Sequence, residues 1–303
     1  MKALDFFFAA RPLLHLPIWG VYLVSLHYHH QLSGEWFTWR DLVMMVSISL
    51  MFAGSSYLNQ VYDFESDRLN RKLGFLQKRL LSQSQLLTGF VMTSVAAMAV
   101  VPFFSRPAIF IFAQLLLLSY TYSAPPVRLK DRPVGGLFAN AWAFGLLVSL
   151  SVMPDMTIHN AGLFGWNAPF YFFFAVGATY ALTTIADRFG DAASAKRTLA
   201  VVLGPNVTMV AAVVLLLLAA LTAIGSRQMF LFFLAAGSAG LTIGAVLLRT
   251  ESSVRLAAKL PLLVLTLVAG FWYPAYLVFV VALLAATRAY YLRRFQVVYP
   301  ELA

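Results

Sequence analysis

The segment Asn59-Gln-Val-Tyr-Asp63-Phe-Glu-Ser-Asp67 stands at the end of a long apolar stretch, directly before a basic loop. A second segment, Asp187-Arg-Phe-Gly-Asp191, ends a later apolar stretch in the same way. Each segment holds two aspartates four residues apart, a spacing that puts both carboxylates on one face of a helix. Ionisable side chains at the end of a membrane span are costly without a partner, so both pairs are functional candidates. Together they predict a divalent-metal site.

The composition identifies the class of protein. Of 303 residues, 61% are hydrophobic and 11% are charged, and the mean hydropathy is +0.79. A chain with so little polar surface cannot cover a soluble globule, and its apolar stretches have the length of about 20 residues that a membrane helix needs. Barrel strands would be shorter and would alternate in polarity. Cysteine is absent, which excludes disulfides and thiolate metal sites. We therefore predict an all-α, polytopic membrane helical bundle.

The basic residues predict the orientation of this bundle. Ten spans are expected near residues 13–30, 41–62, 84–103, 106–122, 133–153, 167–187, 205–225, 228–248, 257–273 and 275–291. With the N-terminus inside, all but three of the 22 basic residues lie on the cytoplasmic side, the exceptions being Arg40, Arg106 and Arg227. Both acidic segments then also lie on that side. The weakest assignment is 257–291, where Pro274 either separates two spans or kinks one long helix.

The two acidic segments indicate an internal duplication. Aligning Asp63 with Asp187 also aligns Asp67 with Asp191, and a basic pair follows each segment, Arg71-Lys72 and Lys196-Arg197. Segments separated by an even number of spans keep one orientation, so both pairs can face one cavity. We expect a single domain over 1–303, with pseudo-repeats at about 1–123 and 124–250 and extra C-terminal helices in 251–303. The alternative is that the four carboxylates only cap or salt-bridge helix ends.

The residue types at these segments favour Mg²⁺ and a diphosphate. Mg²⁺ prefers one or two carboxylates together with phosphate oxygens, and Asn59 adds a neutral oxygen one turn before Asp63. In the loop Tyr120-Thr-Tyr122-Ser-Ala-Pro125-Pro126-Val-Arg128-Leu-Lys130, two cations stand two residues apart. In an extended segment Arg128 and Lys130 point the same way, which suits a phosphate leaving group. The alternative is that these cations only set the membrane topology.

The order and spacing of three motifs resemble the UbiA superfamily of intramembrane prenyltransferases. They are Asn-x-x-x-Asp-x-x-x-Asp from Asn59, Tyr-Ser-x-x-Pro-x-Arg-x-Lys from Tyr122, and Asp-x-x-x-Asp from Asp187, followed by Lys-Arg-Thr-Leu from Lys196. The resemblance covers nearly the whole chain. It implies a helical bundle around a central cavity that opens sideways to lipid, in which Mg²⁺ holds a polyprenyl diphosphate while an acceptor is prenylated. It also implies nine crossings, one fewer than the basic residues favour.

The resemblance assigns roles to matching residues. It implies that Asn59, Asp63 and Asp67 form the first metal and diphosphate site and that Asp187 and Asp191 form the second. It places three loop residues near the diphosphate and the acceptor, and a basic residue after the second motif; these are Tyr122, Arg128 and Lys130, and Lys196. One position departs from the pattern, because Gln60 follows Asn59 where many members have aspartate. This departure leaves open how many carboxylates bind the first ion.

Ionisation of an allylic diphosphate would place negative charge on the leaving group, stabilised by cations, and positive charge on carbon, shielded by an aromatic wall. We expect some of the 26 phenylalanines, which include Phe170 and the run 172–174, to supply that wall. Most of them face lipid or pack the bundle, and the sequence does not show which ones line the cavity. Alternative functions are an intramembrane terpene cyclase, a non-catalytic homologue on the same fold, or a secondary transporter. Expected partners are the lipid bilayer, a polyprenyl diphosphate and a small aromatic or lipid acceptor, with no nucleic acid. The acceptor could be a homogentisate-like quinone precursor or a glycerol phosphate lipid precursor.

Overall fold

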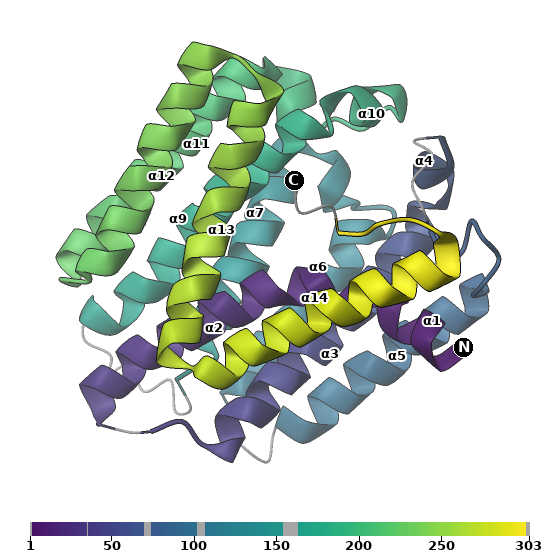
Figure 1. Ribbon diagram of the computed structural model, residues 1–303, viewed down its shortest axis with the longest axis horizontal. Coiled ribbons are helices and arrows are strands. Elements are labelled where there is room, and N and C mark those ends of the chain that lie inside the picture. The colour runs from purple at the N-terminus through teal and green to yellow at the C-terminus, as the bar shows by residue number, and fades with distance from the viewer. Residues whose placement is uncertain (1, 35, 70–73, 102–106, 154–162, 301–303) are drawn as a thin grey trace.

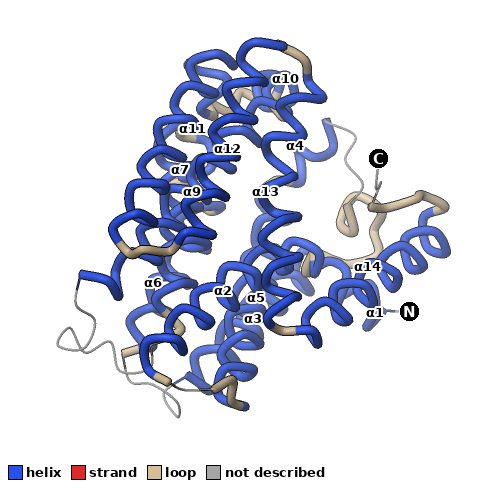
Figure 2. The backbone as a smooth tube through the Cα atoms, turned by 60° about the vertical axis from the view of Figure 1, so that its left-hand side comes forward, coloured by secondary structure: helices blue, strands red, loops and turns tan. Residues whose placement is uncertain are grey.

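The computed structural model describes residues 2–34, 36–69, 74–101, 107–153 and 163–300, and every regular element in these ranges is helical (Figures 1 and 2). The basic residues Arg71, Lys72 and Arg106, and the ends of the predicted spans near 103 and 106, lie outside these ranges. The long helices are α2 (His15–Ser33), α3 (Trp39–Tyr62), α5 (Gln83–Val100), α6 (Ala108–Ser123), α9 (Leu163–Ala186), α11 (Leu199–Gly225), α12 (Met229–Leu248), α13 (Glu251–Trp272) and α14 (Pro274–Phe295). A further span is assembled from α7 (Pro133–Asn140), a π-helical stretch (Ala141–Leu147) and α8 (Val148–Leu150).

Nine helical stretches in the described ranges are long and apolar enough to cross a membrane, and α6 is a shorter apolar helix. The first of these stretches joins α1 (Lys2–Ala9), the 3₁₀ turn Pro12–Leu14 and most of α2. The predicted all-α membrane bundle is thus confirmed. The largest buried cluster of the bundle contains residues from most of the long helices. Each of these helices packs one face against its neighbours and leaves its opposite face for lipid.

Close packing of α9 against the π-helical stretch depends on Gly145. A Cβ atom at this position would lie 2.4 Å from the carbonyl oxygen of Phe172 and 2.8 Å from the Cα of Phe173. Backbone atoms cannot move aside as a flexible side chain can, so only glycine permits this approach. The wider π-helical turns stand on the cavity side of the bundle, where Ala143 and Phe144 line the cavity described below.

Residues 257–291 form two helices and not one kinked helix. Tyr273, with φ −128° and ψ 80°, ends α13, and Pro274 begins α14. In Figure 1, α14 leaves the lower end of α13 and runs to the side of α1. There a guanidinium nitrogen of Arg294 lies 2.9 Å from a carboxylate oxygen of Asp5. The two terminal helices therefore meet at one end of the bundle.

This arrangement gives a topological prediction. A reporter fused after Ala303 should be cytoplasmic, and a glycine-flanked tag inserted at Pro274 should be accessible from outside, because Arg288, Arg293 and Arg294 follow the positive-inside rule. Labelling of the tag in intact cells and the activity of the fused reporter measure the two positions. A reporter found outside would contradict the ten-span topology.

Candidate active site

The first acidic pair lies where α3 gives way to the short helix α4 (Phe64–Leu69). Asp63 ends α3, and its N–H donates a hydrogen bond of 2.8 Å to the carbonyl oxygen of Asn59. The N–H of Asp67 donates in turn to the carbonyl oxygen of Asp63, also at 2.8 Å. The expected helical spacing is therefore present across the junction. Both carboxylates are buried, each residue being 6% exposed.

The second acidic pair has the same local geometry. Asp187 stands between the end of α9 and the short helix α10 (Arg188–Ala193), and the N–H of Asp191 donates to the carbonyl oxygen of Asp187 at 2.9 Å. Asp191 is buried, whereas Asp187 is exposed. In Figures 1 and 2, α4 and α10 lie toward the same end of the bundle. The structure thus brings the two motifs to one end, as their spacing predicts.

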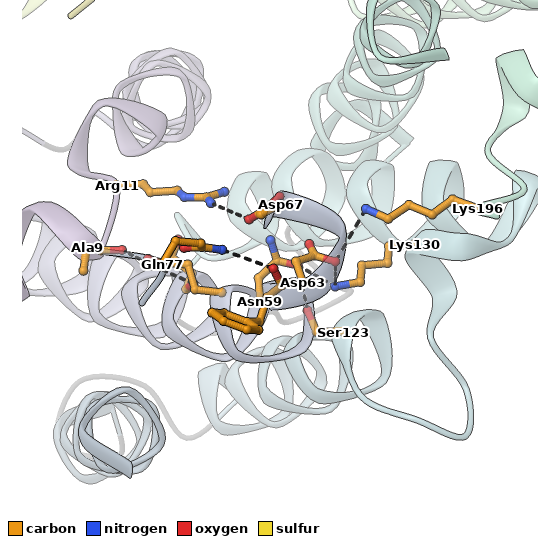
Figure 3. A network of polar contacts seen from close by, with 12 residues as sticks. Ala9, Arg11, Asn59, Asp63, Asp67, Gln77, Ser123, Lys130 and Lys196 are labelled. Carbon is orange, nitrogen blue, oxygen red and sulfur yellow. Dashed lines mark hydrogen bonds and ion pairs between the residues drawn. The ribbon is translucent and has the colours of Figure 1, made fainter. Parts of the chain in front are cut away.

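Asp63 is the centre of a buried polar network (Figure 3). The ammonium group of Lys130 lies 2.8 Å from Asp63 Oδ1 and donates a 2.8 Å hydrogen bond to Asn59 Oδ1. Lys196 Nζ is 3.5 Å from the same carboxylate oxygen. The Ser123 hydroxyl donates to Asn59 Oδ1 at 3.2 Å. Residues from the first two motifs, and the lysine that follows the third, thus converge on the Asp63 carboxylate and the Asn59 amide.

Opposing effects act on the ionisation of this network. Burial raises the pKa of Asp63, but Lys130 and Lys196 together outweigh it and hold the pKa below its ordinary value. Burial lowers the pKa of Lys130, and the carboxylate of Asp63 opposes this change. Since the pKa of Asp63 is depressed, its stabilising contribution is present above the ordinary aspartate pKa and is lost only as the pH falls below it. Asp63 is therefore an anion at neutral pH.

The loop after α6 corrects one expectation. Arg128 has a left-handed backbone (φ 43°), and residues Leu129–Asp131 form a 3₁₀ turn, so the segment is not extended. Consequently Lys130 turns inward and is 6% exposed, whereas Arg128 remains half-buried, with its Nε 2.8 Å from Asp131 Oδ2. The prediction that Arg128 and Lys130 point the same way is wrong. The two cations have different partners.

Tyr122, in the last turn of α6, lines the cavity beside this network. Its hydroxyl is in hydrogen-bonding contact with Asn140 of α7 and Tyr180 of α9. Gly136 leaves the space for this arrangement, because a Cβ there would lie 2.2 Å from the Tyr180 hydroxyl oxygen. Three helices thus meet through polar groups at the wall of the cavity.

The cavity has a volume of about 520 Å³ and two chemically different parts. Its polar lining includes Arg11, Asn59, Tyr122, Tyr180 and Asp187. The rest is mainly apolar, with contributions from Phe52, Leu115, Phe144, Val176 and Leu262.

Two phenylalanines form an aromatic wall in the cavity. Phe52 and Phe144 stack with ring centroids 4.4 Å apart and line the cavity. Phe170 and residues 172–174 are not among its lining residues, although Phe172 lines an adjoining pocket that shares Val176 and Leu262 with this cavity.

Two lining residues were not identified as site candidates from the sequence. A terminal nitrogen of Arg11 is 3.9 Å from Asp67 Oδ2, and His15 lies one turn further along the chain. Arg11 precedes the first apolar stretch and had only a topological meaning there. Arg11 comes after the end of α1 and has a left-handed backbone conformation (φ 55°), which the sequence around it does not predict.

The site fits Mg²⁺ only in company with a phosphate ligand. Among the described residues, no three or more carboxylate or imidazole side chains are close enough together to hold an ion by themselves. Mg²⁺ usually takes one or two carboxylates and completes its octahedron with phosphate oxygens and water. Asn59, Asp63 and Asp67 at the first acidic segment, and Asp187 and Asp191 at the second, could supply such partial sites. The adjacent lysines and Arg11 supply positive charge for an anion.

A model of the UbiA prenyltransferase family matches residues 18–260, which is most of the chain. The chain belongs to this family. Comparison with curated protein sequences gave no match. Among solved structures, a UbiA homologue from Archaeoglobus fulgidus bound to GPP and Mg²⁺ has a TM-score of 0.70 at 18% identity, covering 92% of this chain and 99% of that one.

Two further solved structures are similar. The Archaeoglobus fulgidus homologue bound to DMAPP and Mg²⁺ has a TM-score of 0.67 at 15% identity, with 88% of this chain and 98% of that chain covered. A digeranylgeranylglyceryl phosphate synthase has a TM-score of 0.65, also at 15% identity, with 88% and 96% covered. At these identities the likeness establishes the UbiA fold. The family model ends at residue 260, before α14 begins.

Proposed function

We propose that the protein transfers a prenyl group from an allylic polyprenyl diphosphate to an acceptor within the membrane, with Mg²⁺ as cofactor. The cavity carries this proposal, because its lining combines the polar residues Arg11, Asn59 and Asp187 with a mainly apolar remainder. Asn59 and Arg11 also contact the network of Lys130 and the Asp67 carboxylate beside the cavity. A prenyl diphosphate has the same two parts, an anionic head and a hydrocarbon tail. The family membership of the chain and the Mg²⁺ and prenyl diphosphates bound to its structural relatives support the same assignment.

In this proposal the cationic residues bind the diphosphate. Lys130 and Lys196 stand beside Asp63, and Arg11 stands beside Asp67. Positive groups fixed in a site of low dielectric stabilise charge that develops on a leaving group and need little reorganisation when the bond breaks. Arg128 has a smaller role in this proposal, because it is paired with Asp131.

The five oxygen-bearing residues of the two motifs would hold Mg²⁺: Asn59, Asp63, Asp67, Asp187 and Asp191. When bound, Mg²⁺ would neutralise the diphosphate and improve it as a leaving group. Asp63 is already ionised and held in place by Lys130 and Lys196, so it needs no deprotonation before it acts as a ligand.

The apolar wall protects the reacting carbon. Phe52 and Phe144 present stacked rings inside the cavity, and aromatic faces stabilise nearby positive charge while they exclude water. Tyr122, Asn140 and Thr183 add polar groups to the lining. In this proposal they orient the hydroxyl groups of an aromatic quinone precursor or of a glycerol phosphate lipid.

The test is a turnover assay on protein purified in detergent. Mg²⁺, geranylgeranyl diphosphate and a mixture of homogentisate and glycerol phosphate acceptors are supplied, and products are identified by mass. We expect diphosphate release with an equivalent amount of prenylated acceptor, and loss of both when EDTA removes the metal. A hydrocarbon product formed without acceptor would indicate a cyclase. Absence of diphosphate release would indicate a non-catalytic homologue.

A further inference from the structure

Gln60, which interrupts the family pattern between Asn59 and Asp63, has a role away from the carboxylates. Its side chain is 3% exposed, and its amide nitrogen donates to the carbonyl oxygen of Ala9 at 2.7 Å and to that of Ser56 at 3.2 Å. An aspartate cannot donate these hydrogen bonds when it is ionised. Gln60 therefore attaches the end of α1 to α3.

The same short helix is fixed to α3 at a second point. The hydroxyl of Tyr57, one turn before Gln60, donates to the carbonyl oxygen of Phe6 at 3.0 Å. The Phe6 ring packs edge-on against the Tyr57 ring, with centroids 5.3 Å apart. Beyond α1, the imidazole of His15 bonds to the backbone of Ala10. The segment from Phe6 to Ala10 is thus held by side chains of α2 and α3.

The C-terminal helix holds α1 from the other side. Asp5 is 1% exposed, and the Nε and a terminal nitrogen of Arg294 donate to its two carboxylate oxygens at 3.0 and 2.9 Å. The Tyr290 hydroxyl donates to the same carboxylate, and the Tyr290 ring stacks on Phe8 at 4.0 Å. A two-point contact between a guanidinium and a carboxylate fixes orientation as well as distance. Residues 290–294 lie outside the part of the chain that the family model matches.

These attachments extend to Ala10, directly before Arg11. The backbone turns at Arg11 through a left-handed conformation, and the guanidinium then reaches the Asp67 carboxylate and the polar end of the cavity. Figure 3 shows Ala9 and Arg11 on the same side of the network, with Arg11 directed at Asp67. A long side chain on an unsupported terminal helix would lose much conformational entropy when it binds an anion. A supported one is ordered in advance.

We infer that Gln60 and the Asp5–Arg294 pair are positioning residues that hold Arg11 over the diphosphate head of the donor. The inference rests on the proposed function for the identity of the anion. It gives α14, the helix beyond the family model, a functional role through Arg294, which lies near the C-terminal end of that helix. Arg294 acts through α1 and touches neither donor nor acceptor.

The test is a double-mutant cycle of Arg294→Gln and Arg11→Gln. Each single variant should raise the KM for geranylgeranyl diphosphate about tenfold, with a smaller change in the KM for the acceptor, because only the head-group contact is disturbed. The double variant should be no worse than Arg11→Gln alone, since Arg294 works through Arg11. Arg293→Gln, an exposed neighbour on the same helix, is the matched control and should bind the donor as the wild type does.

A second measurement separates this inference from the proposed function. Hydrogen exchange of amides in residues 2–14, in protein without ligand, should be faster in Arg294→Gln and in Gln60→Leu than in Arg293→Gln. Gln60→Leu also serves if Arg294→Gln does not fold. Unchanged exchange, or effects of Arg294→Gln and Arg11→Gln that multiply, would overturn the positioning role even if the wild type is an active prenyltransferase. Failure of the wild type to bind donor would overturn the proposed function and, with it, the role of Arg11, whereas the exchange result would still judge the attachment of α1.

Discussion

Asp187→Asn is expected to lower prenyl-transfer turnover by about 10²–10³-fold, the usual cost of removing one charge-stabilising group from an active site. Asp187 is exposed at the cavity wall, so the amide should fit without disturbing the fold. Amide oxygens bind Mg²⁺ less strongly than carboxylates do, and the diphosphate would lose part of its counter-charge. Diphosphate release and product formation at saturating Mg²⁺ measure the effect.

The same substitution at Asp63, Asp67 and Asp191 should give losses of similar or greater size. Asp63→Asn carries an added structural cost, because it leaves Lys130 and Lys196 without their shared anion. Glu65→Gln is the control, since Glu65 lies with Asp67 in the short helix α4 but is exposed, and its carboxylate lies 2.8 Å from the Arg68 guanidinium. Near-normal turnover in variants from both acidic pairs would show that these carboxylates are not the metal ligands.

Lys130→Met and Arg128→Met should differ sharply in stability, although the two residues are close neighbours in one loop. Lys130 is one partner of a buried ion pair, and removing one partner of such a pair typically costs about 3–5 kcal/mol. Lys196 remains near Asp63, so the lower end of that range is expected. Arg128 belongs to a partly exposed pair with Asp131, for which about 0.2–1 kcal/mol is usual. Denaturant unfolding in detergent measures both.

Activity should follow the same order. Lys130→Met should also remove donor affinity, whereas Arg128→Met should change it little. The double variant Lys130→Met/Asp63→Leu should recover part of the lost stability but not turnover, because both charges of the closest pair are gone while Lys196 has lost its anion and the site is still incomplete. Equal effects of Lys130→Met and Arg128→Met on donor affinity would contradict the separate roles that the structure gives them.

Local chemistry made much of the protein predictable. The apolar stretches specify membrane helices, because only a helix satisfies its own backbone hydrogen bonds in lipid. The four-residue spacing of Asp63 and Asp67, and of Asp187 and Asp191, follows from helical geometry and holds across both helix junctions. The order of the motifs also indicated the family, which the family model confirms. The proposed pseudo-repeat boundaries and the roles of the site residues stay predictions.

The tertiary structure decided which side chains share a partner. Arg128 and Lys130 have the same charge and stand two residues apart in the sequence, but the backbone turn at Arg128 sends only Lys130 to Asp63. The cavity phenylalanines are Phe52 and Phe144, from segments more than 90 residues apart, and sequence periodicity cannot show which apolar face meets another helix and which meets lipid. The sequence by itself determined the helices and the donor atoms at their ends, because these depend on near neighbours along the chain. The positions of Arg11, Gln60 and α14 depended on contacts between residues far apart in the sequence. The order of residues along the chain does not show which of them meet; burial and hydrogen-bond geometry in the folded bundle decide this.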